Sequence, residues 1–276
     1  MRSLALSVRH PRAPAELVGE IARGGPAVIA LSGGVDSAVV ASLAHEALGD
    51  DCLALTLTGP AVARAEVERA ERVARAIGIP HQKAPADVLA NARYRANPTD
   101  RCYFCRSVET AAVRTVGEVW GARQYLDGVQ VDDLEDDRPG LRAMDEAGFR
   151  HPLVWGGWGK FQVREAARDR HLPNWDQPSD ACLASRVAHG DPITAALLER
   201  IESGEAWIAS RGFRRVRIRT HGDAARVEVD PSEVERLRRE PLRSELEAAL
   251  HALGYGSVEV DPEGYGARPR GSRGVA

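Results

Sequence analysis

Six residues near the start of the chain, SGGVDS at 32–37, combine the features of a phosphate-binding loop. An apolar run at 27–31 precedes them, and a helix-like pattern with Val40, Ala44 and Leu48 on one stripe follows. A strand, a glycine-rich turn and a helix in this order direct backbone N–H groups and the positive end of a helix dipole at the loop. Glycines allow close approach of the backbone, and the two serines add hydroxyl donors. The pattern therefore predicts binding of a phosphate or a pyrophosphate.

The loop differs from the two common nucleotide-binding patterns. No lysine follows its glycines, so it is not a GxxxxGK[ST] loop, and its spacing is not GxGxxG. It resembles the PP-loop of the ATP pyrophosphatases, which cleave ATP between the α and β phosphates and adenylate a carboxylate or carbonyl oxygen. The resemblance implies that ATP and Mg²⁺ bind here, with Asp36 near the phosphates or the metal. The expected pyrophosphate-binding residues are Ser32, Gly33, Gly34, Asp36 and Ser37.

The four cysteines fall into two kinds. Cys52 lies in an apolar, β-rich run, which predicts a buried structural thiol. Cys102 and Cys105 form a CxxC pair in the expected first turn of a helix, where the dipole favours the thiolate. Cys182 lies in a loop-like stretch shortly before a serine and an arginine. In a cytosolic chain such cysteines are more often metal ligands or catalysts than disulfides.

The sequence around these cysteines carries a second, more specific resemblance. Cys182 lies in ACLASR at 181–186 after a Pro-Ser pair, and the CxxC pair lies in NPTDRCYFCR at 97–106. Together these motifs resemble the LarE-type ATP-dependent sulfur transferases, which make the nickel-pincer nucleotide cofactor. The resemblance covers about residues 25 to 230. Further stretches that match in the same order are 127–133, 138–140, 160–164 and 217–228.

This resemblance implies a reaction in two steps. ATP adenylates a carboxylate of pyridinium-3,5-biscarboxylic acid mononucleotide and pyrophosphate is released; sulfur then displaces AMP and leaves a thiocarboxylate. In the branch with three cysteines, Cys102, Cys105 and Cys182 would hold a [4Fe-4S] cluster and leave one iron open. A persulfide, a sacrificial thiol at Cys182 and a zinc site are the alternatives. The family also implies a sulfur donor as a partner and a homo-oligomer.

Basic residues are candidates for binding this substrate, because an adenylated, doubly carboxylated mononucleotide is strongly anionic. Arginine matches carboxylates and phosphates in geometry and charge. Arg217 is a candidate because alternation along its predicted strand places it opposite an apolar face. Glu205 and Glu228 match acidic positions of the family, with ordinary surface carboxylates as the alternative. The other candidates are Arg101, Lys160, Ser185 and Arg186.

The order of predicted elements is that of an α/β protein. Strands at 27–31, 52–58 and 125–126 alternate with helices, which predicts a Rossmann-like parallel sheet with the PP-loop at the carboxyl ends of its strands. We expect a PP-loop domain at 15–170, a smaller α+β substrate or oligomerisation domain at 171–262 and a disordered tail at 263–276. The other expected elements are helices at 14–24, 141–147, 160–169 and 194–210, an extended piece at 149–155, and strands at 214–220, 225–229 and 257–260.

Composition places the chain among ordinary globular proteins. Its 276 residues are 43% hydrophobic and 28% charged. The sequence has no run of 18 apolar residues and no secretory signal, so we predict a cytoplasmic protein without a membrane span. The net charge of -3 argues against a broad nucleic-acid surface.

Three other functions fit parts of the pattern. A tRNA-thiolating PP-loop enzyme would need a basic RNA surface, and an amidating PP-loop ligase would need ammonia but no cysteine triad. A nucleotide-binding sensor would bind ATP without releasing pyrophosphate. Departures from the LarE-type pattern indicate a reshaped pocket: Val129 and Gln130 replace an expected threonine and asparagine, WGGW stands at 155–158, and His189 replaces an aromatic residue.

Overall fold

The computed structural model describes residues 11–134, 139–178 and 181–266. Contacts within the chain divide it into two compact units. Unit 1 comprises Met1–Asn91 and Asp100–Asp180, and unit 2 comprises Ala92–Thr99 and Ala181–Ala276. None of the helices in the described ranges is both long and apolar enough to cross a membrane.

Unit 1 is built on a parallel four-stranded sheet in the order β3-β2-β1-β4, with β1 at Ala27–Ala30 and β2 at Cys52–Thr58. The outer strands are β3 at His81–Pro85 and β4 at Gln124–Leu126. Strands β1 and β4 are buried throughout or nearly so, as expected for parallel strands covered on both faces. The prediction of an α/β fold with a parallel sheet is confirmed, and the PP-loop follows a central strand.

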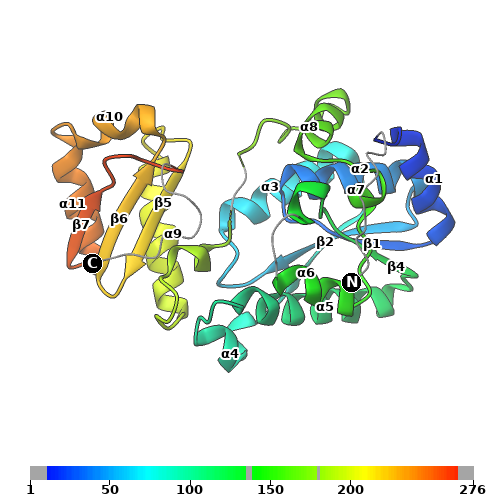
Figure 1. Cartoon of the computed structure of the whole chain (residues 1–276), viewed down its shortest axis with the longest axis horizontal. Helices are drawn as coiled ribbons and strands as arrows, with labels where there is room; N and C mark the ends of the chain where they lie inside the picture. Colours follow the sequence, from blue (N-terminus) through cyan, green and yellow to red (C-terminus); the bar gives the residue numbers. More distant parts are fainter. Residues whose placement is uncertain (1–10, 135–138, 179–180, 267–276) are drawn as a thin grey trace, which may run out of the picture. The chain divides into compact units, whose positions relative to one another are not determined.

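Helices cover both faces of this sheet (Figure 1). On one face α1, α2, α3 and α8 share a core with Ile29, Val40 and Val163. On the other face α5 and α6 pack through Val113 and Met144 onto the opposite side of the strands. The bounds are α1 Pro14–Gly24, α2 Val35–Leu48, α3 Arg64–Ile77, η1 Val88–Ala90, α5 Arg101–Trp120, η2 Val131–Leu134, α6 Pro139–Glu146, α7 Pro152–Trp155 and α8 Lys160–Asp169.

Unit 2 is a small α+β unit around a three-stranded sheet in the order β5-β6-β7. Strands β5 and β6 are antiparallel, and β7 runs parallel to β6. Its core includes Ile208, Ile218 and Leu250 from helices and strands. The bounds are α4 Ala92–Arg95, η3 Leu183–Arg186, α9 Ala195–Ala209, β5 Val216–His221, β6 Ala224–Val229, η4 Pro231–Glu233, α10 Val234–Arg238, α11 Leu242–Ala252 and β7 Ser257–Val260.

The division between the units lies later in the chain than the expected boundary at 170/171. Leu172 belongs to the core of unit 1, and Asn174 hydrogen-bonds to the PP-loop, so the chain stays with unit 1 up to Asp180. Residues 92–99 join unit 2, because the side chain of Asn97 donates to the carbonyl oxygens of Ala188 and Asp191.

The structure corrects two local predictions and adds one strand that the sequence does not indicate. The piece at 149–155, expected to be extended, contains the helical turn α7, because Pro152 starts a helix and turns Leu153 into the core. The sequence does not predict strand β3, because its residues HQKAP are mostly polar; within the described residues it is the edge strand next to β2.

The second correction concerns the expected disordered tail at 263–276. Its first residues pack against β6, where the Tyr265 N–H donates to the Val229 carbonyl oxygen at 2.8 Å. The Tyr265 ring also stacks with Arg215 and Arg217. The contacts of Tyr265 therefore order the start of the segment, although the Gly- and Arg-rich composition of the segment predicts disorder. The remainder, 267–276, lies outside the described residues.

Candidate active site

The PP-loop connects the end of β1 to the first turn of α2. Gly33 has a φ of +80°, and a Cβ there would lie 2.7 Å from the Glu66 carbonyl oxygen, so only glycine fits. The Ser37 hydroxyl is buried; it accepts from the Ser32 N–H at 3.2 Å and donates to the Gly34 carbonyl oxygen at 3.1 Å. Ser37 therefore braces the loop from inside, whereas Ser32 is exposed and its hydroxyl can reach a ligand.

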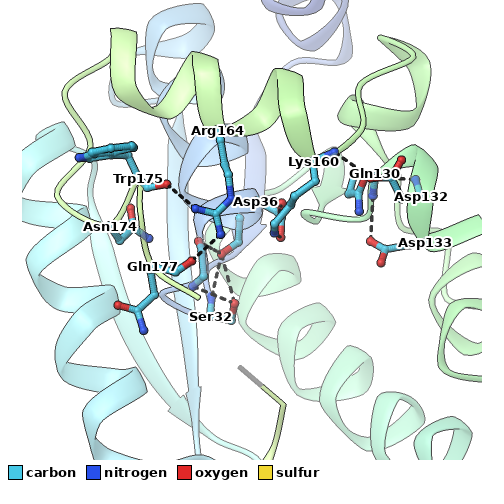
Figure 2. A network of polar contacts seen from close by, with 12 residues as sticks. Ser32, Asp36, Gln130, Asp132, Asp133, Lys160, Arg164, Asn174, Trp175 and Gln177 are labelled. Carbon is cyan, nitrogen blue, oxygen red and sulfur yellow. Dashed lines mark hydrogen bonds and ion pairs between the residues drawn. The ribbon is translucent and has the colours of Figure 1, made fainter. Parts of the chain in front are cut away.

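A cation from another part of the chain lies at this loop. The Lys160 ammonium contacts both carboxylate oxygens of Asp36, at 2.7 and 2.9 Å (Figure 2). Lys160 is the first residue of α8, and its N–H donates to the Asp132 carboxylate at 2.9 Å. The structure thus brings together two predicted site residues, Asp36 and Lys160. Together with the α2 dipole, Lys160 makes the loop suited to an anion.

A short segment at 172–177, the strap, crosses the PP-loop. The buried Asn174 amide donates to the Gly33 carbonyl oxygen at 2.9 Å. Arg164 of α8 donates to the carbonyl oxygens of Trp175 at 3.2 Å and Gln177 at 3.0 Å (Figure 2). The sequence did not indicate these contacts, because the strap reads as a loop near a domain boundary.

The end of β4 also packs onto the PP-loop. A Cβ on Gly128 would lie 2.5 Å from the Ser37 nitrogen, so the Asp127–Gly128 turn lies directly against the first turn of α2. Asp127 is buried and binds His151, a residue that sequence reasoning missed. No motif pointed to His151, because its partners come from separate segments.

The CxxC pair lies where the sequence predicts it, at the beginning of α5. Cys102 is exposed and Cys105 is half-buried, with its Sγ 3.5 Å from a Glu109 carboxylate oxygen. Arg101, the first residue of α5, is buried. Cys52 is buried, and burial, then the charges of the two aspartates before it, raise its pKa to about 12, as expected for a structural thiol.

Cys182 belongs to unit 2 and is exposed immediately before η3. Arg186 donates to the carbonyl oxygens of Ala181 and Cys182 and to the Ser185 hydroxyl. Its other nitrogens bind both oxygens of Glu205, at 2.9 and 3.0 Å. Arg186 thus fixes the turn that carries Cys182. Across the described ranges, no set of three or more His, Cys, Asp and Glu side chains is arranged to hold a metal ion.

The strand residues of unit 2 show a second arginine–glutamate pair. Arg219 binds both oxygens of Glu228 at 3.1 Å and donates to the Ser185 carbonyl oxygen. Glu205 also accepts from the Ile218 N–H at 2.9 Å. Both predicted acidic residues are therefore partners of arginines rather than isolated surface carboxylates. The predicted Arg217 lies 4.3 Å from the ring centre of Tyr265, and its role stays a prediction.

Comparison with known proteins identifies relatives of this arrangement. A family model described as NAD synthase matches residues 20–104. The uncharacterized protein slr1717 of Synechocystis is 36% identical over 250 residues, covering 91% of this chain and 92% of that protein. The pyridinium-3,5-bisthiocarboxylic acid mononucleotide synthase of Lactiplantibacillus plantarum is 28% identical, covering 86% of each. The tRNA-specific 2-thiouridylase MnmA of Xanthobacter autotrophicus is 30% identical over 64% of this chain and 56% of its own length. The chain belongs to the same family as the Synechocystis protein. Like its characterised relatives, it is an ATP-using enzyme of the PP-loop group.

Proposed function

We propose that this enzyme adenylates a carboxylate of a small mononucleotide with ATP and then replaces AMP with sulfur. The observation that carries the proposal is a braced PP-loop with Lys160 at Asp36, in a chain that also exposes Cys102 and Cys182. The Lactiplantibacillus relative is named for a product with two thiocarboxylates. This supports pyridinium-3,5-biscarboxylic acid mononucleotide as the substrate and nickel-pincer nucleotide synthesis as the purpose.

In the first step, a carboxylate oxygen of the substrate attacks the α-phosphorus of ATP. The bond to the pyrophosphate oxygen breaks and that oxygen keeps the electron pair. Loop N–H groups, the Ser32 hydroxyl and Lys160 would stabilise the charge that develops on pyrophosphate. For this, Lys160 would leave Asp36 and contact the phosphates when ATP binds. The freed Asp36 carboxylate would be available to hold Mg²⁺.

In the second step, a sulfur nucleophile attacks the activated carboxyl carbon, and AMP leaves with the C–O electron pair. Cys102, Cys105 and Cys182 are the residues that would supply or hold this sulfur. Their partial or full exposure and their soft thiolate chemistry suit the ligands of an iron–sulfur cluster, and binding the cluster would have to bring together three thiols that are not grouped in the described residues. A [4Fe-4S] cluster bound to the three thiolates would supply a sulfide from its open iron. A persulfide or a sacrificial Cys182 remains the metal-free alternative.

The basic residues would bind the anionic substrate and its adenylate. Arg101 starts the helix that carries the CxxC pair, and Arg217 extends from β5. Arg186 would act by holding the Cys182 turn, with Glu205 as its partner. Glu228 would hold Arg219 in the same way, and Arg219 in turn fixes the Ser185 carbonyl. A homo-oligomer and an external sulfur donor complete the proposal.

The experiment is an exchange assay joined to metal analysis on anaerobically purified protein. Exchange of labelled pyrophosphate into ATP should require the biscarboxylate mononucleotide and should survive Cys182→Ala, because adenylation precedes sulfur transfer. Thiocarboxylate formation should stop in Cys182→Ala and Cys102→Ala. Cys52→Ala is the matched control, because it removes a buried thiol in β2 that has no proposed role in sulfur transfer. Circular dichroism checks that each variant folds.

Each alternative has its own result in this assay. Iron and sulfide lost in Cys182→Ala would support the cluster, and mass loss at Cys182 after turnover would support a sacrificial thiol. Full activity of Cys102→Ala with ammonia as the acceptor would favour an amidating ligase. Exchange stimulated by tRNA and not by the mononucleotide would overturn the proposed substrate in favour of tRNA thiolation.

A further inference from the structure

A cluster of three titratable side chains lies beside the PP-loop, at the end of β4, and has no part in the chemistry proposed above. Its centre is His151, whose Nδ1 lies 2.8 Å from Asp127 Oδ1 and whose Nε2 lies 2.8 Å from Asp145 Oδ1. The three residues come from three segments: the turn after β4, the last turn of α6 and the residue before α7. An imidazole that contacts carboxylates at both nitrogens is suited to the doubly protonated, cationic form.

Asp127 has few other means of neutralising its charge. The residue is only 4% exposed. Its Oδ1 also accepts from the Val129 N–H at 2.9 Å, whereas its Oδ2 is buried and binds no donor among the described residues. A buried carboxylate is stable only next to an opposite charge or several donors. His151 supplies that charge.

The same carboxylate belongs to a turn on which the ATP site depends. A Cβ on Gly128 would lie 2.5 Å from the Ser37 nitrogen and 2.8 Å from the Asp36 carbonyl carbon. The turn therefore touches the backbone that joins the PP-loop to α2. Any displacement of Asp127 moves Gly128, and Gly128 cannot move toward α2 without displacing residues 36 and 37.

Burial lowers the pKa of His151, but the hydrogen bonds and charges of Asp127 and then Asp145 outweigh burial and raise it to about 9. Of the two carboxylates, Asp145 is the one exposed to solvent, since its side chain is 60% exposed. The neighbouring charged residue, Arg150, has other partners: its guanidinium stacks on the Trp155 ring, donates to Gln124 and lies 3.9 Å from Glu20. Asp127 and Asp145 are thus the charges that act on the imidazole.

We propose that His151 is a positioning residue that, as a cation held between Asp127 and Asp145, keeps the Asp127–Gly128 turn packed against the PP-loop helix and so maintains the ATP site. Loss of its proton leaves the buried Asp127 without a counter-charge, loosens the turn and weakens ATP binding. His151 does not touch the nucleotide. The inference concerns ATP binding alone and is independent of the sulfur chemistry.

The test is a pH series of calorimetric titrations with Mg²⁺ and α,β-methylene-ATP, which the enzyme cannot cleave to pyrophosphate. In the wild type the dissociation constant should be flat near neutrality and rise about tenfold once His151 is deprotonated, the effect of one pKa unit of coupling. Asp145→Asn removes one of the two charges that hold the proton. Its rise should therefore begin at a lower pH than in the wild type.

Asp169→Asn is the matched control, since Asp169 is 69% exposed and lies at the far end of α8. It should follow the wild-type curve. His151→Gln should bind weakly at every pH without the step; if it does not fold, the Asp145→Asn curve still decides. Coincident curves for Asp145→Asn and the wild type would overturn the inference, because the charge of Asp145 would then have no effect on the group whose protonation controls ATP binding. If the wild type bound no nucleotide at any pH, the assignment of the PP-loop as an ATP site would be wrong.

Discussion

Two ion pairs, one in each unit, involve basic residues that the sequence predicts to bind phosphate or substrate. In unit 1 Lys160 pairs with Asp36, and their side chains are 29% and 27% exposed. In unit 2 Arg186 pairs with Glu205, and their side chains are 3% and 14% exposed. The same chemical pattern therefore serves two purposes. We propose that Lys160 exchanges Asp36 for a ligand, whereas Arg186 holds the turn that carries Cys182.

The energetics of the two pairs explain this division. The Lys160–Asp36 pair is partly open to solvent, where ion pairs contribute about 0 to 1 kcal/mol, so displacement of Asp36 by a phosphate is expected to cost little. Arg186 is different because its donors are shared among the Glu205 carboxylate, the Ser185 hydroxyl and backbone carbonyls. Its removal would leave a mostly buried carboxylate without a counter-charge, which is strongly unfavourable.

The largest effect should follow from Arg186→Ala, which we expect to lower the free energy of unfolding of unit 2 by about 3–5 kcal/mol. Urea denaturation followed by circular dichroism measures this. Arg238→Ala is the matched control, because Arg238 is 45% exposed and lies 3.8 Å from Glu235. If both variants unfolded at the same urea concentration, Arg186 would not be part of the framework.

Lys160→Ala should change activity and not stability. We expect pyrophosphate exchange to fall by about 10²- to 10³-fold, the usual loss for one preorganised charge on a leaving group. The melting temperature should stay near the wild-type value, because the pair with Asp36 is partly open to solvent. Lys83→Ala, which removes a 51% exposed partner of Glu71, is the control for loss of a lysine. A Lys160→Ala enzyme with unchanged exchange would show that Lys160 does not contact the phosphates.

Local patterns in the sequence predict the PP-loop of unit 1 and its flanking elements well. The apolar run, the glycines and the following helix of residues 27–48 are contiguous, so their order alone indicates β1, the PP-loop and α2. The first turn of α5 with its CxxC pair follows from local signals in the same way. Lys160 was identified through a family motif, and its position as the first residue of α8 agrees with the predicted helix.

The contacts that shape the site could not be predicted, because they join residues far apart in the chain. Lys160 and Asp36 are separated by 124 positions, and Asn174 and Gly33 by 141. Nothing near Asn174 distinguishes it from a polar loop residue. Likewise the sequence predicts that Arg186 binds a ligand. Only its buried contacts with Glu205 and with the Cys182 carbonyl show that it holds the turn that carries Cys182.

The Asp127–His151 pair is buried like the Arg186–Glu205 pair, but its basic member, His151, loses its charge at alkaline pH. The folded-state pKa of His151, about 9, lies above its ordinary value of about 6.5. The stabilisation is therefore complete below about pH 6.5 and is lost as the pH rises through about 9; it amounts to about 3 kcal/mol at most. Urea denaturation from neutral to alkaline pH should show this loss in the wild type and not in His151→Gln.

His221→Gln is the control for that series, because His221 is 64% exposed and lies beside Asp191. Its pH dependence should follow the wild type. If His151→Gln lost the same stability at alkaline pH as the wild type, His151 could not carry the charge that neutralises Asp127.

The smallest effect tests whether the strap acts on the ATP site without touching the ligand. Asn174→Ala removes the amide that donates to the Gly33 carbonyl oxygen, at an expected cost of about 1–2 kcal/mol for a buried acceptor left unpaired. Because the Gly33 backbone faces the predicted pyrophosphate site, the loss should appear as a KM for ATP raised several-fold with kcat little changed. Gln177→Ala is the matched control: Gln177 binds Arg164 through its backbone carbonyl, which the variant keeps. Equal KM values in the two variants would mean that the strap lies against the PP-loop without setting its shape.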